Sequence, residues 1–124
     1  MSSFNEREKS FEKKFVHDEE KKFKISARRN KYLGQWASKI LHYNSDQEKE
    51  YIQAVIKADF KEHGDEDVFQ KIKEDLKLHN ISDDQIREKM KELNEKAKSE
   101  FKQSSNIFLF INFIFLFFNS KKYH

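Results

Sequence analysis

The sequence predicts an all-α protein, a small antiparallel four-helix bundle preceded by a mobile helical arm. The 124-residue chain contains no proline and two glycines, so it has few of the residues that tight turns between strands require. Lysine, glutamate, leucine, isoleucine and phenylalanine recur instead at helical spacing. A chain of this length can bury one core but not a second one. We therefore expect one domain built from helices.

The first expected helix begins at Ser3, because residues 3–6 have the serine-x-x-glutamate form of a capping box. Its pattern continues to Leu41. A helix of this length is unusual in a globular protein, so we expect a break or fraying near His17 and Asp18. We assign residues 1–19 to an arm and residues 20–103, which include the more apolar half of this helix, to a four-helix body.

Phenylalanines mark one face of this first helix. They stand at positions 4, 11, 15 and 23, and most residues between them are charged. Steps of seven, four and eight residues place all of them on one face of a helix. Such a narrow apolar stripe fits an amphipathic helix that packs on its own domain, and it also fits a helix that docks in a groove of another protein. The spacing alone does not choose between these two arrangements.

Three further helices are expected to complete the body after a turn at residues 42–44. The second helix should start with a capping box at residues 45–48 and end at Gly64, which supplies the left-handed position after a helix. The third should open with the carboxylates of residues 65–67, where the helix dipole favours negative charge. The fourth should start with a capping box at residues 82–85. The expected buried stripes are Ile52, Val55, Ile56 and Phe60, then Val68 or Phe69, Ile72 and Leu76, then Ile86, Met90, Leu93, Ala97 and Phe101.

Residues 104–124 do not continue the pattern of the body. Between Ile107 and Phe118 every residue except Asn112 is large and apolar. As a helix this stretch would span about 18 Å, less than the roughly 30 Å of a membrane's hydrocarbon core. Three interpretations stay open: a recent extension of the chain, an anchor to a membrane or interface, or a segment that packs on the body. Membrane contact is expected only if this tail is genuine.

Charge is distributed unevenly along the chain. Residues 1–31 contain ten basic and six acidic residues, whereas residues 44–103 contain twelve basic and sixteen acidic residues. A basic segment before an acidic body suits docking to an acidic protein surface, and the alternatives are nucleic acid or an anionic membrane surface. In the basic segment, however, acidic residues interleave with the basic ones, and no aromatic platform for bases is present. We therefore expect no nucleic acid.

The sequence contains no recognisable catalytic or metal-binding constellation, so we expect neither an enzyme nor a cofactor. Without cysteine there is no thiol nucleophile, and the five histidines include no pair three or four residues apart. No apolar leader opens the chain, so we do not expect a secreted precursor. The densest cationic cluster contains Arg28, Arg29 and Lys31. It would suit a phosphate or nucleotide, with a solvated helix face as the alternative.

The opening stretch resembles a known family. Its motif is Phe4-x-x-Arg7-Glu8-x-x-Phe11-Glu12-x-Lys14-Phe15-x-His17-Asp18-x-Glu20-x-x-Phe23, followed by residues 27–31 and 33–37, and a second block covers residues 55–60 and 64–68. Together they are similar to the zeta subunit family, the inhibitor subunits of the alphaproteobacterial F-type ATP synthase. The resemblance covers about residues 3–101. Val16 stands where the family usually has alanine, and the tail has no counterpart.

The resemblance implies a four-helix protein without catalytic activity, located in the cytoplasm and held at the inner face of the cell membrane by the ATP synthase. Its N-terminal segment would insert at a catalytic interface between the α and β subunits of the ATPase head, next to the γ subunit, and block rotation in the hydrolytic direction. Some members are thought to bind ATP or ADP, and here Arg28, Arg29 and Lys31 are the candidates. The partner-binding residues that it implies are Phe4, Arg7, Glu8, Phe11, Lys14, Phe15, His17 and Asp18.

Overall fold

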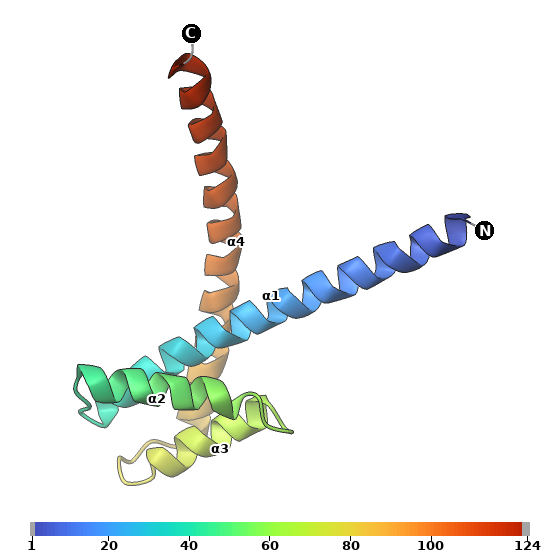
Figure 1. Cartoon of the computed structure of the whole chain (residues 1–124). Helices are drawn as coiled ribbons and strands as arrows, with labels where there is room; N and C mark the ends of the chain where they lie inside the picture. The colour runs from blue at the N-terminus through green and yellow to red at the C-terminus, as the bar shows by residue number, and fades with distance from the viewer. Residues whose placement is uncertain (1, 123–124) are drawn as a thin grey trace.

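The computed structural model describes the backbone of residues 2–122 and the side chains of residues 18–103. Within that range all regular secondary structure is helical, which confirms the prediction of an all-α protein. The helices are α1 (Ser2–Ile40), α2 (Ser45–Ala58), α3 (Asp65–Asp75) and α4 (Asp83–Lys122). Figure 1 shows two long helices, α1 and α4, that cross each other, with the two short helices packed beside the crossing.

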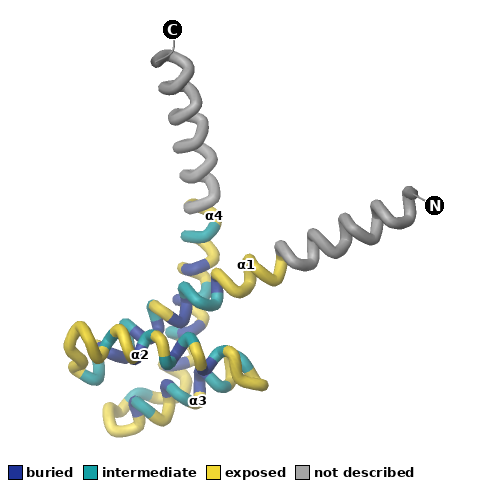
Figure 2. The backbone as a smooth tube through the Cα atoms, viewed as in Figure 1, coloured by how far each residue is buried: buried dark blue, intermediate teal, exposed yellow. Residues whose placement is uncertain are grey.

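One apolar core holds the four helices together. α1 packs against both α2 and α4, and α3 closes the body by packing on α2 and α4. The buried residues gather where the helices meet, as the dark blue segments of Figure 2 show. The core consists of Leu33 and Ala37 from α1, Tyr51, Val55 and Ala58 from α2, Val68, Phe69, Ile72 and Leu76 from α3 and its end, and Ile86, Met90 and Leu93 from α4. Both predicted stripes of the last two helices are confirmed, except that Phe101 is only half-buried.

α1 is a single continuous helix, so the predicted break near His17 and Asp18 is wrong. Sharp kinks in helices arise at proline, at glycine or serine pairs, or where a group inserts into the hydrogen-bond ladder. Residues 2–40 contain no proline and one isolated glycine. An ion pair between Glu19 and Lys22, at 3.8 Å, adds a small local contribution one residue after the expected break. The helix therefore continues without interruption from the N-terminal segment into the body.

The start of α2 lies one residue earlier than predicted. Its N-cap is Asn44, not Ser45. The Gln47 backbone N–H donates to Asn44 Oδ1 at 2.9 Å, and the Asn44 backbone N–H donates to Gln47 Oε1, also at 2.9 Å. Asparagine and glutamine thus form the reciprocal capping box that serine and glutamate usually supply. At α4 the prediction is confirmed, because the Ser82 N–H donates to Gln85 Oε1 and the Gln85 N–H donates to Ser82 Oγ.

The end of α2 also differs from the prediction. α2 ends at Ala58, and Gly64, with φ of 54°, is the N-cap residue of α3 instead of the residue that ends α2. The chain therefore leaves the helix before Phe60, which is exposed instead of buried. The buried stripe of α2 consists of Tyr51, Val55 and Ala58, while the predicted members Ile52 and Ile56 are half-buried.

α1 and α2 approach each other closely at Gly34. A Cβ atom at this position would lie 3.0 Å from both Cα and Cγ1 of Ile52. Nine in ten real Cβ contacts are longer than this, so the absence of a side chain permits the close approach of the two helices here. The glycine is thus required for packing, not for a turn.

Candidate partner-binding site

The segment of α1 from Asp18 to Lys24 lies at the edge of the body and is exposed to solvent. All seven of its residues are exposed, and Ile25 is the first buried residue of α1 among those whose side chains are described. Figure 2 shows this exposed stretch where α1 enters the body. Among the predicted partner-binding residues, Asp18 lies in this segment and faces solvent. The others, Phe4, Arg7, Glu8, Phe11, Lys14, Phe15 and His17, lie outside the residues whose side chains are described.

Phe23 and Phe60 form an exposed aromatic pair at the base of this segment. Their ring centroids are 5.6 Å apart, and their planes are inclined by 35°. Phe23 is 52% exposed and Phe60 is 65% exposed. The residue spacing predicts Phe23 on the apolar face of α1 and Phe60 in the core. No spacing rule connects the two positions, so the pair has no signal in the sequence.

Arg29 lies inside the body and holds three helices together. It is 3% exposed, and its Nη2 lies 2.8 Å from Asp65 Oδ1 and 3.6 Å from Asp59 Oδ2. Its Nε donates to Asn30 Oδ1 at 3.1 Å, and Asn30 Nδ2 donates to Asp59 Oδ2 at 3.0 Å. The hydrogen bond from Arg29 holds the pKa of Asp65 below its usual value. This cluster joins α1 to the residue after α2 and to the first residue of α3.

The three cations predicted to bind a nucleotide do not converge. Arg29 is committed to two carboxylates, so a phosphate would have to displace both of them. Arg28 points toward α4, where its Nη1 lies 3.7 Å from Glu100 Oε2, and Glu100 also accepts a hydrogen bond from Tyr32. Lys31 is exposed. Two of these side chains thus bind carboxylates on different parts of the body, and nucleotide binding at Arg28, Arg29 and Lys31 stays a prediction.

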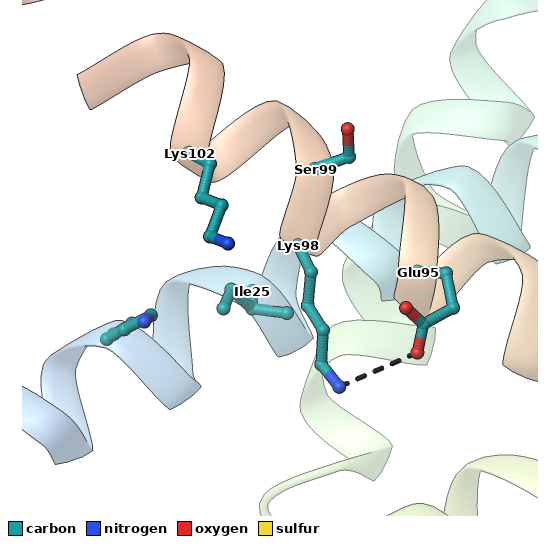
Figure 3. Close-up of a pocket in the computed structure, with 6 residues that line it drawn as sticks. Ile25, Glu95, Lys98, Ser99 and Lys102 are labelled. Atoms are coloured by element: carbon teal, nitrogen blue, oxygen red, sulfur yellow. Dashed lines mark ion pairs between the residues drawn. The ribbon is translucent and has the colours of Figure 1, made fainter. Parts of the chain in front are cut away.

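A shallow groove of about 420 Å³ lies between α1 and α4 where the two helices diverge. Its lining consists of Lys21 and Ile25 from α1 and Glu95, Lys98, Ser99 and Lys102 from α4. Figure 3 shows Lys98 reaching Glu95, at 3.6 Å, which offsets part of the positive charge. The open groove and its flexible lysines suit weak attraction of anions more than a tight ligand site.

The described side chains, residues 18–103, contain no cluster of histidine, aspartate and glutamate that could hold a metal ion. Within the same residues, no helix carries a run of apolar residues long enough to cross a membrane. The most distinctive features of this range are thus an exposed helix segment and an aromatic pair beside it.

A family comparison assigns the chain. The sequence profile described as ATPase inhibitor subunit zeta matches residues 1–100, which cover the arm and nearly all of the body. The chain belongs to this family. The predicted relationship to the zeta subunits is therefore confirmed, and so is the general role of the family as inhibitor subunits of an ATPase. The match ends before the apolar tail of residues 104–124. A search of curated proteins found no match.

For a zeta-family chain, the body has a clear structural task. Arg29, Asp59 and Asp65 tie α1 to α2 and α3, and Gly34 lets α1 approach α2 closely. These contacts hold the C-terminal part of α1 against the other helices.

Proposed function

We propose that this chain inhibits ATP hydrolysis by an F-type ATPase, and that residues 1–19 are the inhibitory arm. The arm enters the catalytic head at an interface between α and β subunits, close to the γ subunit, and blocks rotation in the hydrolytic direction. The observation that carries the proposal is the zeta-family match over residues 1–100. It is supported by the helix that runs unbroken from Ser2 to Ile40 and is exposed from Asp18 to Lys24.

The chemistry of the arm fits binding to a protein groove. Phe4, Phe11 and Phe15 act as apolar anchors, and truncation of such an anchor costs about 1–4 kcal/mol of binding free energy. Arg7 and Lys14 steer the arm toward acidic surface on the head, because charged groups at the rim mainly raise the association rate. Glu8, His17 and Asp18 provide polar contacts along the same helix.

The body acts as the holder of the arm. A helix rises about 1.5 Å per residue, so the last arm residue lies only about 9 Å from Ile25, where α1 becomes buried. The arm therefore cannot enter the head without bringing the bulk of the body against the head's outer surface. Such a wedge resists closure of the interface, which rotation in the hydrolytic direction requires.

The same proposal places the chain in the cytoplasm, peripherally at the inner face of the cell membrane through the ATP synthase. The chain performs no chemical step of its own in this mechanism. Nucleotide binding at Arg28, Arg29 and Lys31 is not needed for it, and the two carboxylates at Arg29 oppose such binding.

The test is an activity titration with the purified cognate ATPase. ATP hydrolysis should fall to a low plateau as the chain is added, whereas ATP synthesis by the same enzyme in energised vesicles should be spared. Replacing Phe11 and Phe15 by alanine should raise the half-inhibitory concentration by at least about tenfold, since each tenfold corresponds to about 1.4 kcal/mol. Undiminished hydrolysis at a saturating concentration of the folded chain would refute the proposal.

A further inference from the structure

The exposed pair Phe23 and Phe60 is an unusual surface feature of this body. Phe23 comes from α1, and Phe60 comes from the turn between α2 and α3. Each of the two residues is more than half exposed. Single exposed apolar residues are common, but two adjacent exposed aromatic rings keep a contiguous apolar patch in solvent. An apolar patch of this kind is a candidate contact site.

The fold does not account for this patch. Neither ring belongs to the core that joins the four helices. The turn at Phe60 is formed by main-chain hydrogen bonds, in which the N–H groups of Phe60 and Lys61 donate to the carbonyl oxygens of Lys57 and Ala58 at 3.1 and 3.2 Å. Any residue other than proline can make these bonds. A polar side chain would serve the turn equally well and avoid the exposed apolar surface.

In this patch, Phe23 lies on the same continuous helix as the phenylalanines of the arm. α1 is unbroken, so Phe23 lies about 12 Å along the helix axis from Phe15 and about 29 Å from Phe4. A protein interface of standard size buries about 800 Å² on each partner, which corresponds to a patch about 32 Å across. A partner surface of this size is therefore long enough to extend from Phe4 to Phe23 along the helix, and Phe60 packs beside Phe23.

We propose that Phe23 and Phe60 form a second anchor, through which the body binds an apolar depression on the outer surface of the same ATPase head. This inference rests on the proposed function, because it takes the head as the partner of the arm. One inserted helix leaves the body free to swivel about the helix axis. A second contact from a different segment of the chain removes that freedom and turns the body into a fixed stop.

The second anchor also strengthens binding without new contacts in the arm. Once the arm is inserted, Phe60 is held beside the head, and its binding becomes an intramolecular event with a high effective concentration. The two rings should lose little conformational entropy on binding, because they already pack on each other and each side chain has few rotatable bonds. Affinity should therefore depend on Phe60 although it lies outside the arm.

The test uses the full-length chain with Phe60→Ala, Phe23→Ala and the control Leu78→Ala. Leu78 is 85% exposed and lies after α3, at the opposite end of that helix from Phe60. Phe60→Ala and Phe23→Ala should each raise the half-inhibitory concentration for ATP hydrolysis by about tenfold. Leu78→Ala should leave it within about twofold. Phe60→Leu, which keeps an apolar side chain, should recover most of the loss.

Circular dichroism melting of each variant separates lost contact from lost fold, since exposed residues contribute little to stability. Unchanged melting with weaker inhibition supports the anchor. If the unaltered chain inhibits and both alanine variants inhibit equally well, the second anchor is wrong while the proposed function stands. If the unaltered chain does not inhibit at all, the proposed function fails and the anchor fails with it.

Light scattering adds one more check. If the unaltered chain is a dimer and Phe60→Ala is a monomer, the patch is a contact between two copies, and the inference is overturned.

Discussion

Replacing Arg29 by methionine should destabilise the body strongly, although it removes only one charged side chain. Breaking a fully buried ion pair costs about 3–5 kcal/mol, because an unpaired charge stays behind. Here Asp59 is only 18% exposed and loses its cation, whereas Asp65 is 70% exposed and is solvated by water. Methionine refills most of the volume. We therefore expect a loss of about 2–3 kcal/mol in the free energy of unfolding, which is less than the loss for a fully buried ion pair.

Thermal unfolding followed by circular dichroism measures this loss. For a domain of this size, 1 kcal/mol shifts the melting temperature by about 4–8 °C, so Arg29→Met should melt roughly 10–20 °C lower. The matched control is Lys73→Met, which removes the exposed ion pair between Lys73 and Asp83, at 3.1 Å, and should cost less than about 1 kcal/mol. If the two variants melt at the same temperature, the cluster around Arg29 does not join the helices as argued.

The pH dependence of this variant provides a second readout. Arg29 lowers the pKa of Asp65 from its usual 3.8 in the folded chain. A carboxyl group whose pKa is lowered by folding stabilises the fold above pH 3.8, and this contribution is lost as the pH falls through the lower folded pKa. The difference in stability between the unaltered chain and Arg29→Met should therefore shrink in acid. A difference that stays constant down to acid pH would contradict the pairing.

Two further substitutions test the packing of α2. Gly34→Ala places a Cβ 3.0 Å from Cα and Cγ1 of Ile52. The overpacking should cost about 1–3 kcal/mol and outweigh the gain of about 1 kcal/mol in helix propensity, so urea unfolding should show a less stable variant. A more stable variant would contradict the close approach. Burial and the hydrogen bond to Asp75 raise the pKa of Tyr51 above 10.0. The contribution of Tyr51 to the free energy of unfolding should therefore be fully present below pH 10.0 and be lost as the pH rises through the higher pKa of the folded chain. Tyr51→Phe should cost about 1 kcal/mol at neutral pH and reduce this alkaline loss, which an unchanged pH profile would disprove.

The parts of the fold that the sequence predicts correctly depend on residues close together in the chain. Ser82 and Gln85 cap α4 through bonds that span three residues. The buried stripes of α3 and α4 follow from spacings of three and four residues. Such local rules need no knowledge of how the helices are arranged.

The errors arise where distant residues decide the outcome. Phe60 fits the periodicity of α2, but α2 stops before it, and Asp59, the residue after the helix, accepts a hydrogen bond from Asn30 on α1. Likewise Arg29 is a cation in the sequence, whereas its burial depends on partners 30 and 36 residues away. The break expected in α1 came from the usual length of helices, and the local absence of helix-breaking residues outweighed it.

The candidate site was predicted unequally. The arm residues followed from the phenylalanine spacing and the family motif, and the prediction of their role stays a prediction. The aromatic pair could not be found this way, because Phe23 and Phe60 are brought together by the packing of α1 on α2. A patch built from two separate segments has no periodic signature in the sequence.

The most direct test of the central claim compares two chains in one assay. ATP hydrolysis by the purified cognate ATPase head is titrated with the full chain and with a chain that begins at residue 20, whose folding is verified by its melting curve. The account predicts inhibition by the full chain alone, with residues 1–19 as the inhibitory element. Equal inhibition by both chains would move the active surface onto the body, and failure of both would contradict the proposed function.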